Sequence, residues 1–508
     1  MKKQLPKFPH SYWQDTTLPE FPKLNDSIKV DVAIAGGGIT GITAAYLLAK
    51  QNMKVALIDS DKILNGTTGH TTAKISAQHG LIYDEFISHF GLEKTKLYYN
   101  AQLEAKKFIE ETIQELNIKC GFQKEDAYIY TNSNEYVAKL EKEMKAYEKL
   151  QIESDLTDEM PLNLPMKSVL RMKNQAQFHP LQYLKRLVEE AIANGAAFYE
   201  NTVALDVEHN KDPAIISNDG HRIYSKYVIS ATHFPFYDMT NSSYFARMYP
   251  ERAYVVAGQT EKEFPGGIYL SAEDPVRSIR ATPKQGKSLW LIGGENHRTG
   301  EGVSTIKHYE ALQSFAKKHF DIDDIQFRWS AQDLTTLDKI PYIGKITKAQ
   351  DTVFVATGYR KWGMTNGTIA AKMLTDMILQ KKTPYEEVFT PARFNADPSV
   401  KQFLKTGADT AKQMVKGKLE LPKRKIEDLD HDDATITRIN GQRTGVYKDE
   451  NGTIYAVDTT CRHMGCEVSW NSGDRTWDCP CHGSRYSYDG EVIEGPAKKP
   501  LKIRDLNM

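Results

Sequence analysis

The sequence between Lys29 and Asp59 decides the fold of the larger part of this chain. It begins with a β-rich run, Lys29-Val-Asp-Val-Ala-Ile-Ala35, and continues as Gly36-Gly37-Gly38-Ile39-Thr40-Gly41. The apolar, Ala-rich stretch that follows predicts a helix over residues 42–51, and Lys54-Val-Ala-Leu-Ile-Asp59 predicts a second strand that ends in an acid. Glycines at this spacing between a strand and a helix, with an acid about twenty residues on, are typical of a dinucleotide-binding turn.

Each residue of this pattern has a physical task. Gly36 permits the tight turn, Gly38 lets the backbone approach a pyrophosphate, and Gly41 lets the helix pack closely on the strand. The N-terminus of the helix then faces phosphate, and Asp59 accepts a ribose hydroxyl. A glycine-rich turn in an unrelated α/β domain is the structural alternative.

Two cysteine–histidine half-sites stand near the C-terminus. They read Cys461-Arg-His463-Met-Gly-Cys466 and Cys479-Pro-Cys481-His482-Gly-Ser484-Arg-Tyr486. Two thiolates and two imidazoles are the ligand set of a Rieske [2Fe-2S] cluster. A zinc site is the alternative, although zinc fingers usually pair Cys with Cys and His with His.

From Thr435 onward the chain resembles Rieske domains. This resemblance implies that Cys461, His463, Cys479 and His482 bind the cluster. It also implies that Cys466 and Cys481 form a disulfide between the two cluster-binding loops. Ser484 and Tyr486 resemble the hydroxyl donors of high-potential Rieske proteins, whose hydrogen bonds stabilise the reduced cluster and raise its potential.

Composition limits the classes of partner. The chain has 508 residues, enough for two or three domains, and 66 basic against 66 acidic residues, so nothing points to nucleic acid or to an anionic membrane. No apolar run reaches the length of a membrane span, and no secretory signal is visible. Cys120 is the one cysteine outside the half-sites, and we expect a buried thiol. These features predict a cytoplasmic protein.

Residues 28–382 resemble the D-amino acid oxidase/glycine oxidase superfamily of flavoproteins. A predicted strand, Thr352-Val-Phe-Val-Ala-Thr357, runs into Gly358-Tyr-Arg-Lys-Trp-Gly-Met364, and a helix follows to about Lys381. Further ordered matches are Phe178-His-Pro180, Asn194-Gly-Ala196, Ile229-Ser-Ala-Thr232, Trp290-Leu-Ile-Gly-Gly-Glu295 and Asp338-Lys-Ile-Pro-Tyr-Ile-Gly344.

This resemblance implies bound FAD, held by segments at both ends of the domain with substrate-sheet segments between them. Besides Gly36, Gly38, Gly41 and Asp59, the implied FAD-binding residues are Thr67, His70, Thr71, Val203, Gly358, Gly363, Met364 and Thr365. No second strand-linked glycine pattern appears, which disfavours NAD(P)H as the electron donor.

His70 has a second possible role. Some relatives that oxidise methylated glycines attach FAD through a histidine in a Gly-Ser-Thr-Trp-His segment, and Gly66-Thr-Thr-Gly-His70 resembles that spacing but lacks the Trp. A loop histidine that only forms hydrogen bonds is the alternative, and His79 is ambiguous in the same way.

Five residues are candidates for substrate contact: Arg280, Asp333, Tyr359, Lys361 and Trp362. Arg280 offers a planar fork that suits a carboxylate, with a surface ion pair as the alternative. Asp333 falls near the position at which amino-acid oxidases of this family carry an arginine, and an acid there favours a cationic amine. Tyr359, Lys361 and Trp362 follow the strand that closes on the flavin.

The expected fold is multidomain α/β plus all-β. A Rossmann-like FAD-binding domain interleaved with an antiparallel-sheet substrate domain spans residues 1–384, a helical connector spans 385–430, and a small all-β Rieske domain spans 431–508. Strands are predicted at 435–439, 444–447 and 453–457, with an Asn-Gly turn between the last two. The Lys-rich stretch from Pro398 to Lys418 is predicted to be helical.

We expect an enzyme. The favoured hypothesis is an FAD dehydrogenase that takes a hydride from a small amine or amino acid and passes electrons singly to the Rieske cluster and then to an unknown external acceptor. One alternative is an oxidase in which O2 reoxidises the flavin and the Rieske domain is structural. The other is a non-catalytic, redox-sensing or partner-binding protein.

Overall fold

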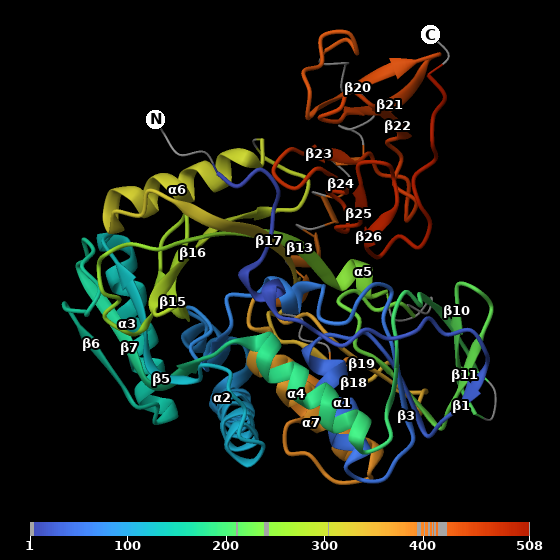
Figure 1. Ribbon diagram of the computed structural model, residues 1–508. Coiled ribbons are helices and arrows are strands. Elements are labelled where there is room, and N and C mark those ends of the chain that lie inside the picture. Colours follow the sequence, from blue (N-terminus) through green and yellow to red (C-terminus); the bar gives the residue numbers. More distant parts are fainter. Residues whose placement is uncertain are drawn as a thin grey trace.

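The computed structural model describes residues 5–506 apart from 210–211, 238–242, 303, 394–397, 401, 405–406, 409, 411–412 and 415–423. Figure 1 shows an N-terminal α/β part, with the all-β C-terminal part seated on one end of its large sheet, beside β13, β17 and α5. The multidomain α/β plus all-β fold predicted from the sequence is confirmed.

The predicted nucleotide-binding sheet has six strands among the described residues. Their order is β18-β19-β12-β2-β3-β8, and all neighbours are parallel except β18 and β19. The strands are β2 (Val32–Ala35), β3 (Val55–Ile58), β8 (Ala197–Tyr199), β12 (Tyr227–Ser230), β18 (Tyr342–Lys345) and β19 (Val353–Thr357). Their spread along the chain confirms the interleaved arrangement.

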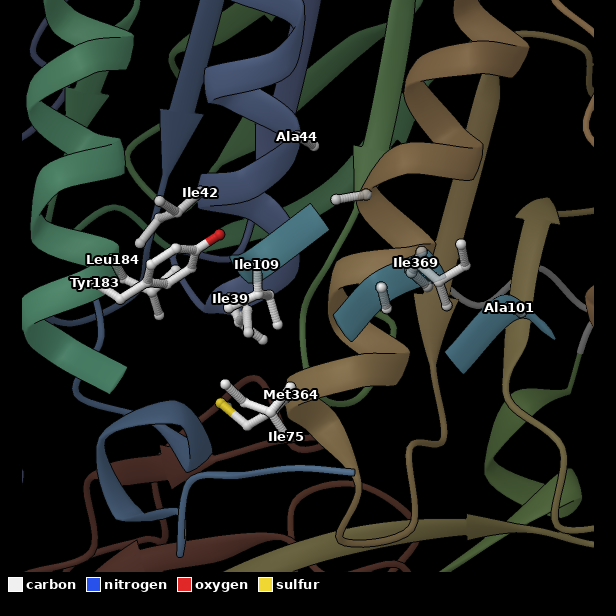
Figure 2. Packing of buried hydrophobic residues seen from close by; sticks show 14 of the residues in the cluster. Ile39, Ile42, Ala44, Ile75, Ala101, Ile109, Tyr183, Leu184, Met364 and Ile369 are labelled. Atoms are coloured by element: carbon white, nitrogen blue, oxygen red, sulfur yellow. The ribbon is translucent and has the colours of Figure 1, made fainter. Parts of the chain in front are cut away.

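Three helices pack side by side next to this sheet: α1 (Ile39–Ala49), α4 (Pro180–Ala193) and α7 (Gly363–Ile378). Ile42, Ala44 and Leu184 belong to the main apolar core and are fully buried. Figure 2 shows Ile75 beside Met364 at the start of α7. Burying a side chain of this size stabilises the fold by roughly 1.5–3 kcal/mol, so this cluster holds the segments of the predicted FAD site together.

The second large sheet belongs to the predicted substrate part. Its main path, β17-β13-β16-β15-β14-β5-β7-β4, is antiparallel except between β14 and β5, and β6 pairs with β7. Its strands are β4 (Lys74–Ile75), β5 (Gln123–Thr131), β6 (Ser154–Thr157), β7 (Ser168–Gln177), β13 (Met248–Gly258), β14 (Ile268–Ser271), β15 (Arg277–Lys284), β16 (Lys287–Arg298) and β17 (Ile325–Thr336). The helices around it are α2 (Tyr83–Glu115), α3 (Asn134–Leu150) and α6 (Ile306–Phe320).

The C-terminal part consists of two small antiparallel sheets. One contains β20 (Asp433–Ile439), β21 (Gln442–Lys448) and β22 (Ile454–Asp458), and the other contains β23 (Ser469–Asn471), β24 (Thr476–Asp478), β25 (Arg485–Ser487) and β26 (Val492–Glu494). The predicted Asn-Gly turn joins β21 to β22, where the amide of Gly452 donates to the carbonyl of Asp449 over 3.2 Å.

The remaining elements are short. They are η1 (Tyr12–Asp15), η2 (Thr67–His70), α5 (Tyr244–Arg247), α8 (Glu386–Phe389) and the edge sheet β1 (Ile28–Lys29), β9 (Ala204–Glu208), β10 (Ala214–Ser217) and β11 (Arg222–Tyr224). The helix after the glycine turn begins at Ile39, three residues earlier than predicted, because Gly38 already caps it. Within the helix predicted from Pro398 to Lys418, the residues that the structure describes are helical, namely 398–400, 402–404, 407–408, 410 and 413–414, and the others lie outside the described residues. Of the helices that are described, none is both long and apolar enough to cross a bilayer.

Buried charges join the two parts of the chain. Arg252 on β13 lies 3.3 Å from a carboxylate oxygen of Asp474 and 3.5 Å from one of Asp478. Arg485 contacts the same two acids at 3.2 and 3.3 Å and pairs with Glu494 at 2.7 Å. Arg252 is 1% exposed. We call these five residues the junction network.

The arginines of the junction network lower the pKa values of Asp474 and Asp478. Burial by itself would raise the pKa of Asp474 and Asp478, but the charges of Arg252 and Arg485 outweigh it, and both pKa values lie below the usual range. A carboxyl group whose pKa is lowered in the folded state stabilises the fold above its unfolded pKa and loses that contribution as the pH falls. The junction should therefore be intact at neutral pH and weaken below about pH 4.

Arg252→Met should destabilise the joined structure by about 3–5 kcal/mol, because it leaves buried carboxylates without one of their two cations. Thermal unfolding followed by calorimetry, together with limited proteolysis of the C-terminal part, measures this effect. Arg222→Met is the matched control, since Arg222 pairs with Glu208 at the surface and such pairs contribute about 1 kcal/mol or less. Equal unfolding temperatures for the two variants would contradict the prediction.

Candidate functional site

The glycine turn is built by close backbone contacts. Gly36 has φ +109°, and a Cβ there would lie 2.6 Å from the carbonyl oxygen of Ala231. A Cβ on Gly41 would lie 1.9 Å from the carbonyl oxygen of Gly36. Only glycine fits at either position, and the bare turn leads directly into the N-terminus of α1. This arrangement fits the pyrophosphate of a dinucleotide.

Asp59 lies beside this turn, just after β3. Its carboxylate accepts hydrogen bonds from the amides of Gly37 at 2.6 Å and Asp61 at 3.0 Å. Burial raises its pKa to about 6. The amide of Thr202 donates to the carbonyl of Asp59 over 2.8 Å, which brings the neighbouring Val203 to the same edge of the sheet.

The loop after β3 returns to the start of α1. Thr68, which the sequence analysis did not single out, accepts a hydrogen bond from the amide of Ile39 through Oγ1 at 3.1 Å. Thr67 donates from Oγ1 to the carbonyl of Gln332 at 3.3 Å, and the carbonyl of Thr71 accepts from the indole of Trp13 at 2.7 Å. Among the predicted FAD contacts in this loop, Thr67 and Thr71 are thus already engaged with neighbouring segments.

His70 is held by its own loop. Nδ1 lies 2.9 Å from the carbonyl oxygen of Gly66, and the carbonyl of His70 accepts from the indole of Trp329 at 2.9 Å. Burial lowers the pKa of the imidazole. This geometry is that of a hydrogen-bonding loop histidine, and covalent attachment of FAD through His70 stays a prediction.

The second FAD segment begins where β19 ends. Gly358 has φ +80°, and Tyr359 places its hydroxyl 2.7 Å from Oγ1 of Thr40 on α1. Arg360 and Lys361 both adopt positive φ angles, +47° and +68°. Two consecutive side-chain-bearing residues in this region represent stored backbone strain, which clusters at functional sites.

The start of α7 is tied to the loop that carries His79. Trp362 precedes Gly363, the first residue of the helix, and stacks on the imidazole of His79 with ring centres 4.7 Å apart. Nε2 of His79 lies 3.1 Å from Oγ1 of Thr365. Burial, aided by the charge of Arg360, lowers the pKa of His79 to about 3, so the ring is neutral.

Two of the substrate candidates meet directly. The amide of Lys361 donates to a carboxylate oxygen of Asp333 over 3.1 Å, and the Lys361 ammonium lies 4.0 Å from Glu251. Burial raises the pKa of Asp333 against the opposing charge of Lys361. Asp333, near the end of β17, therefore contacts the segment that follows β19, and its role toward a cationic amine stays a prediction.

Arg280 has a different environment from the one expected. It is 1% exposed, and one guanidinium nitrogen donates to the carbonyls of Thr72 and Ala73 at 2.7 and 2.8 Å. Burial lowers its pKa to about 9. Because its donors are taken by backbone, this geometry assigns Arg280 to holding the 72–73 segment and argues against both a substrate anchor and a surface ion pair.

Lys74 is a site residue that the sequence analysis missed. Its ammonium donates to Oγ of Ser278 and lies 5.6 Å from the centre of the Trp362 ring. Burial, then the charge of Arg280, lowers its pKa to about 7. The signal in the sequence is slight, a single lysine on a two-residue strand directly after the Thr-rich loop.

The two cysteine–histidine half-sites form matching turns. The amides of Gly465 and Gly483 donate to the carbonyls of Cys461 and Cys479, both at 3.0 Å. The amides of Cys461 and Cys479 in turn donate to carbonyls five residues on, at 2.7 and 2.8 Å. Gly465 and Gly483 have φ angles of +78° and +80°, which the turns require.

These turns bring the proposed ligands together. Cys466 and Cys481 form a disulfide with Cα atoms 6.5 Å apart, which leaves Cys461 and Cys479 as free, buried thiols. The imidazoles of His463 and His482 lie 5.0 Å apart and at right angles. Two free thiols and two imidazoles at facing loop tips fit a Rieske cluster.

Polar groups around the ligand cysteines agree with this arrangement. The Tyr486 hydroxyl lies 3.3 Å from Sγ of Cys461 and accepts from the amide of Arg462 at 3.0 Å. Hydrogen bonding with Cys479 and Tyr486 holds the pKa of Cys461 below its usual value. Ser484 is fully buried and accepts from the amide of Ala497 through Oγ at 3.0 Å.

We call the edge of this site that carries His463 and His482 the histidine edge. It faces the N-terminal part of the chain. The ring of Phe245 on α5 lies 5.7 Å from His463 and 5.5 Å from His482, and the ring of Phe234 lies 6.4 Å from His463. The side-chain amide of Gln332 donates to the carbonyl of Gly483 over 2.9 Å. Sequence reasoning had no means of finding these contacts.

Tyr486→Phe should lower the reduction potential of the cluster by on the order of 50 mV, because it removes one hydrogen bond to a ligand sulfur. A redox titration followed by electron paramagnetic resonance (EPR) measures the shift. Tyr488→Phe is the control, since Tyr488 is a partly exposed neighbour on the same side of the module. An unchanged potential in Tyr486→Phe would mean that this hydroxyl does not act on the cluster.

Comparison with known proteins gives two family matches. The family described as FAD dependent oxidoreductase (DAO) matches residues 31–377, and the Rieske [2Fe-2S] domain family matches residues 420–505. A protein of Bacillus subtilis (strain 168) named as a Rieske 2Fe-2S iron-sulfur protein, YhfW, is 48% identical over 500 residues, which cover 98% of each chain.

More distant relatives cover the N-terminal part. Gamma-glutamylputrescine oxidoreductase of Escherichia coli (strain K12) is 22% identical over 372 residues, which cover 70% of this chain and 85% of that protein. The crystal structure of glycine oxidase from Geobacillus kaustophilus superposes with a TM-score of 0.61 at 18% identity, and covers 72% of this chain and all of that one.

The glycine turn, the interleaved sheets and the paired half-sites agree with these matches. The chain belongs to the FAD dependent oxidoreductase family, as an enzyme that carries FAD and, in a C-terminal Rieske domain, a [2Fe-2S] cluster.

Proposed function

We propose that this enzyme oxidises an amine or amino acid at FAD and passes the electrons singly through the Rieske cluster to an external acceptor. FAD takes up a hydride equivalent, whereas a Rieske cluster exchanges one electron at a time. The proposal has two parts, the class of substrate and the route of the electrons, and different observations support each.

A path of hydrogen bonds and covalent bonds between the two sites supports the proposed electron route. At one end, the amide of Ile39 at the start of α1 donates to Thr68. The adjacent Thr67 donates to the carbonyl of Gln332, whose side chain donates to the carbonyl of Gly483 beside the ligand His482. The loop η2 and strand β17 thus connect the FAD turn to a cluster-binding loop within one folded unit.

Packing at the histidine edge also supports electron transfer between the FAD site and the cluster. Phe245 contacts both ligand imidazoles from α5, and Phe234 follows directly on the segment 231–233 that touches the glycine turn. A Cβ on Gly483 would lie 2.7 Å from Cβ of Pro250. A cluster loop packed this closely onto the flavin part favours electron exchange between the two groups without separation of the modules.

The substrate class draws support from relatives and from the site. The proteins that resemble this chain include gamma-glutamylputrescine oxidoreductase and glycine oxidase, whose names indicate an amine derivative and an amino acid as substrates. In this chain, Lys361 and Trp362 lie on the strained segment after β19, and Asp333 on β17 accepts a hydrogen bond from the amide of Lys361. Such groups orient a substrate against the flavin, which is the main requirement of hydride transfer.

Anaerobic mixing of the purified enzyme with a panel of amines and amino acids tests the proposal. One substrate should bleach the flavin absorbance, and the EPR signal of the reduced cluster should then grow at the expense of the reduced flavin. A flavin that bleaches while the cluster stays oxidised would favour the alternative of an O2-using oxidase with a structural Rieske domain. Full peroxide-forming turnover in a folded His482→Ala variant would favour the same alternative. Failure of every substrate, together with reversible partner binding, would favour a redox sensor.

Gln332→Leu should slow reduction of the cluster about tenfold or more while substrate still reduces the flavin, because it removes the contact between β17 and the Gly483 carbonyl. Stopped-flow absorbance separates the two steps. Gln326→Leu, on the same strand but bonded to Gln259, is the matched control. If Gln332→Leu transfers electrons at the rate of the control, the route through η2 and β17 is wrong.

A further inference from the structure

Lys74 lies where the loop from the glycine turn meets the large sheet. It begins β4, and the next residue, Ile75, packs against Met364 at the start of α7 (Figure 2). Its ammonium contacts the hydroxyl of Ser278 on β15 and lies over the ring of Trp362, the residue before α7. The lysine is therefore next to the segment that closes on the flavin.

The charge of this lysine has no acid opposite it. Among the described residues, no carboxylate pairs with the Lys74 ammonium, whose polar partner is the neutral hydroxyl of Ser278. The neighbouring charge is another cation, Arg280, whose donors are used on backbone carbonyls. The acid that acts on Arg280 is Glu125, and its carboxylate accepts from the amide of Gly267 at 2.6 Å.

The Lys74 ammonium is partly buried and has no opposite charge beside it. Removal of a charge from water is unfavourable unless an opposite charge compensates it. Burial and the Arg280 charge lower the pKa of Lys74 to about 7, so much of the population carries the charge at neutral pH. Because part of the side chain stays accessible, an anion from outside the chain could reach this cation and compensate its charge.

We propose that Lys74 binds the carboxylate of the substrate, so that this enzyme acts on amino acids and not on amines that lack a carboxylate. This inference rests on the proposed function and narrows its substrate class. The ammonium forms an ion pair with the carboxylate, Ser278 keeps the lysine side chain in place, and Trp362 closes the apolar side. Arg280, one of the carboxylate anchors considered from the sequence, holds the 72–73 backbone that leads into Lys74.

The ion pair predicts selective binding of carboxylates. Anthranilate is the probe, and aniline, the same ring without the carboxylate, is its control. Perturbation of the flavin absorbance on titration gives Kd for each. Lys74→Met should weaken anthranilate binding about 10–100-fold and change aniline binding less than twofold, whereas Lys74→Arg should retain most of the anthranilate affinity. Lys287→Met, at an exposed lysine on β16 paired with Glu261, should match the wild type.

Thermal stability without ligand is a second readout, independent of turnover. Lys74→Met should melt at or above the wild-type temperature, since it removes a partly buried charge that has no opposite charge beside it and keeps a side chain of similar length. A lysine with a purely structural role would lower the melting temperature when replaced. Anthranilate should raise the melting temperature of the wild type and not that of Lys74→Met.

Three results would overturn the inference. They are absence of anthranilate binding in the wild type, equal anthranilate affinity in Lys74→Met, or equal weakening of anthranilate and aniline, which would mean that the cation serves the flavin itself. Failure of the proposed function looks different. In that case carboxylates bind through Lys74 as expected, but no amino acid reduces the flavin.

Discussion

The charges of the junction network, Arg252 with Asp474, Asp478, Arg485 and Glu494, are the constraint on which the rest of the structure depends. Neither part of the chain can satisfy these charges alone, because Arg252 comes from β13 and the others from the Rieske domain. A buried charge without its partner costs more than the pair contributes, so a displaced or rotated Rieske domain is heavily penalised. The network therefore fixes one orientation between the two redox sites.

In this orientation, one short loop contacts both the FAD turn and the strand that leads to the cluster. Residues 67–70 of η2 contact the start of α1 through Thr68 and β17 through Thr67. Strand β17 continues to the cluster loop through Gln332. One rigid segment therefore supports the FAD turn on one side and the cluster on the other. On the proposed electron route, an external acceptor would contact the Rieske domain away from the histidine edge, because Phe245 packs against both imidazoles there.

The residues proposed to face the substrate combine a strained backbone with charged side chains. Arg360 and Lys361 hold left-handed conformations directly after the flavin-closing strand, and Trp362 stacks on His79. Lys74 approaches the same tryptophan from β4. The acid Asp333 on β17 and the partly buried cation Lys74 on β4 both lie near the segment that precedes α7. In the proposed function, this pairing suits a substrate with both an amine and a carboxylate.

The sequence by itself determined the nucleotide turn and the two half-sites, because these depend on spacing over a few residues. The interleaved fold was implied by the resemblance of ordered motifs along the whole N-terminal part to a known superfamily. The turns at Cys461 and Cys479 close through hydrogen bonds four and five residues apart, and the glycine turn needs only a missing Cβ. For Arg280 the sequence left two roles open, a carboxylate anchor and a surface ion pair, and the structure instead places its guanidinium against two backbone carbonyls. Lys74 meets Ser278 across 204 residues, and Gln332 meets Gly483 across 151. Only the tertiary structure decides such pairs, because no local pattern records which distant side chain a fold will bring near.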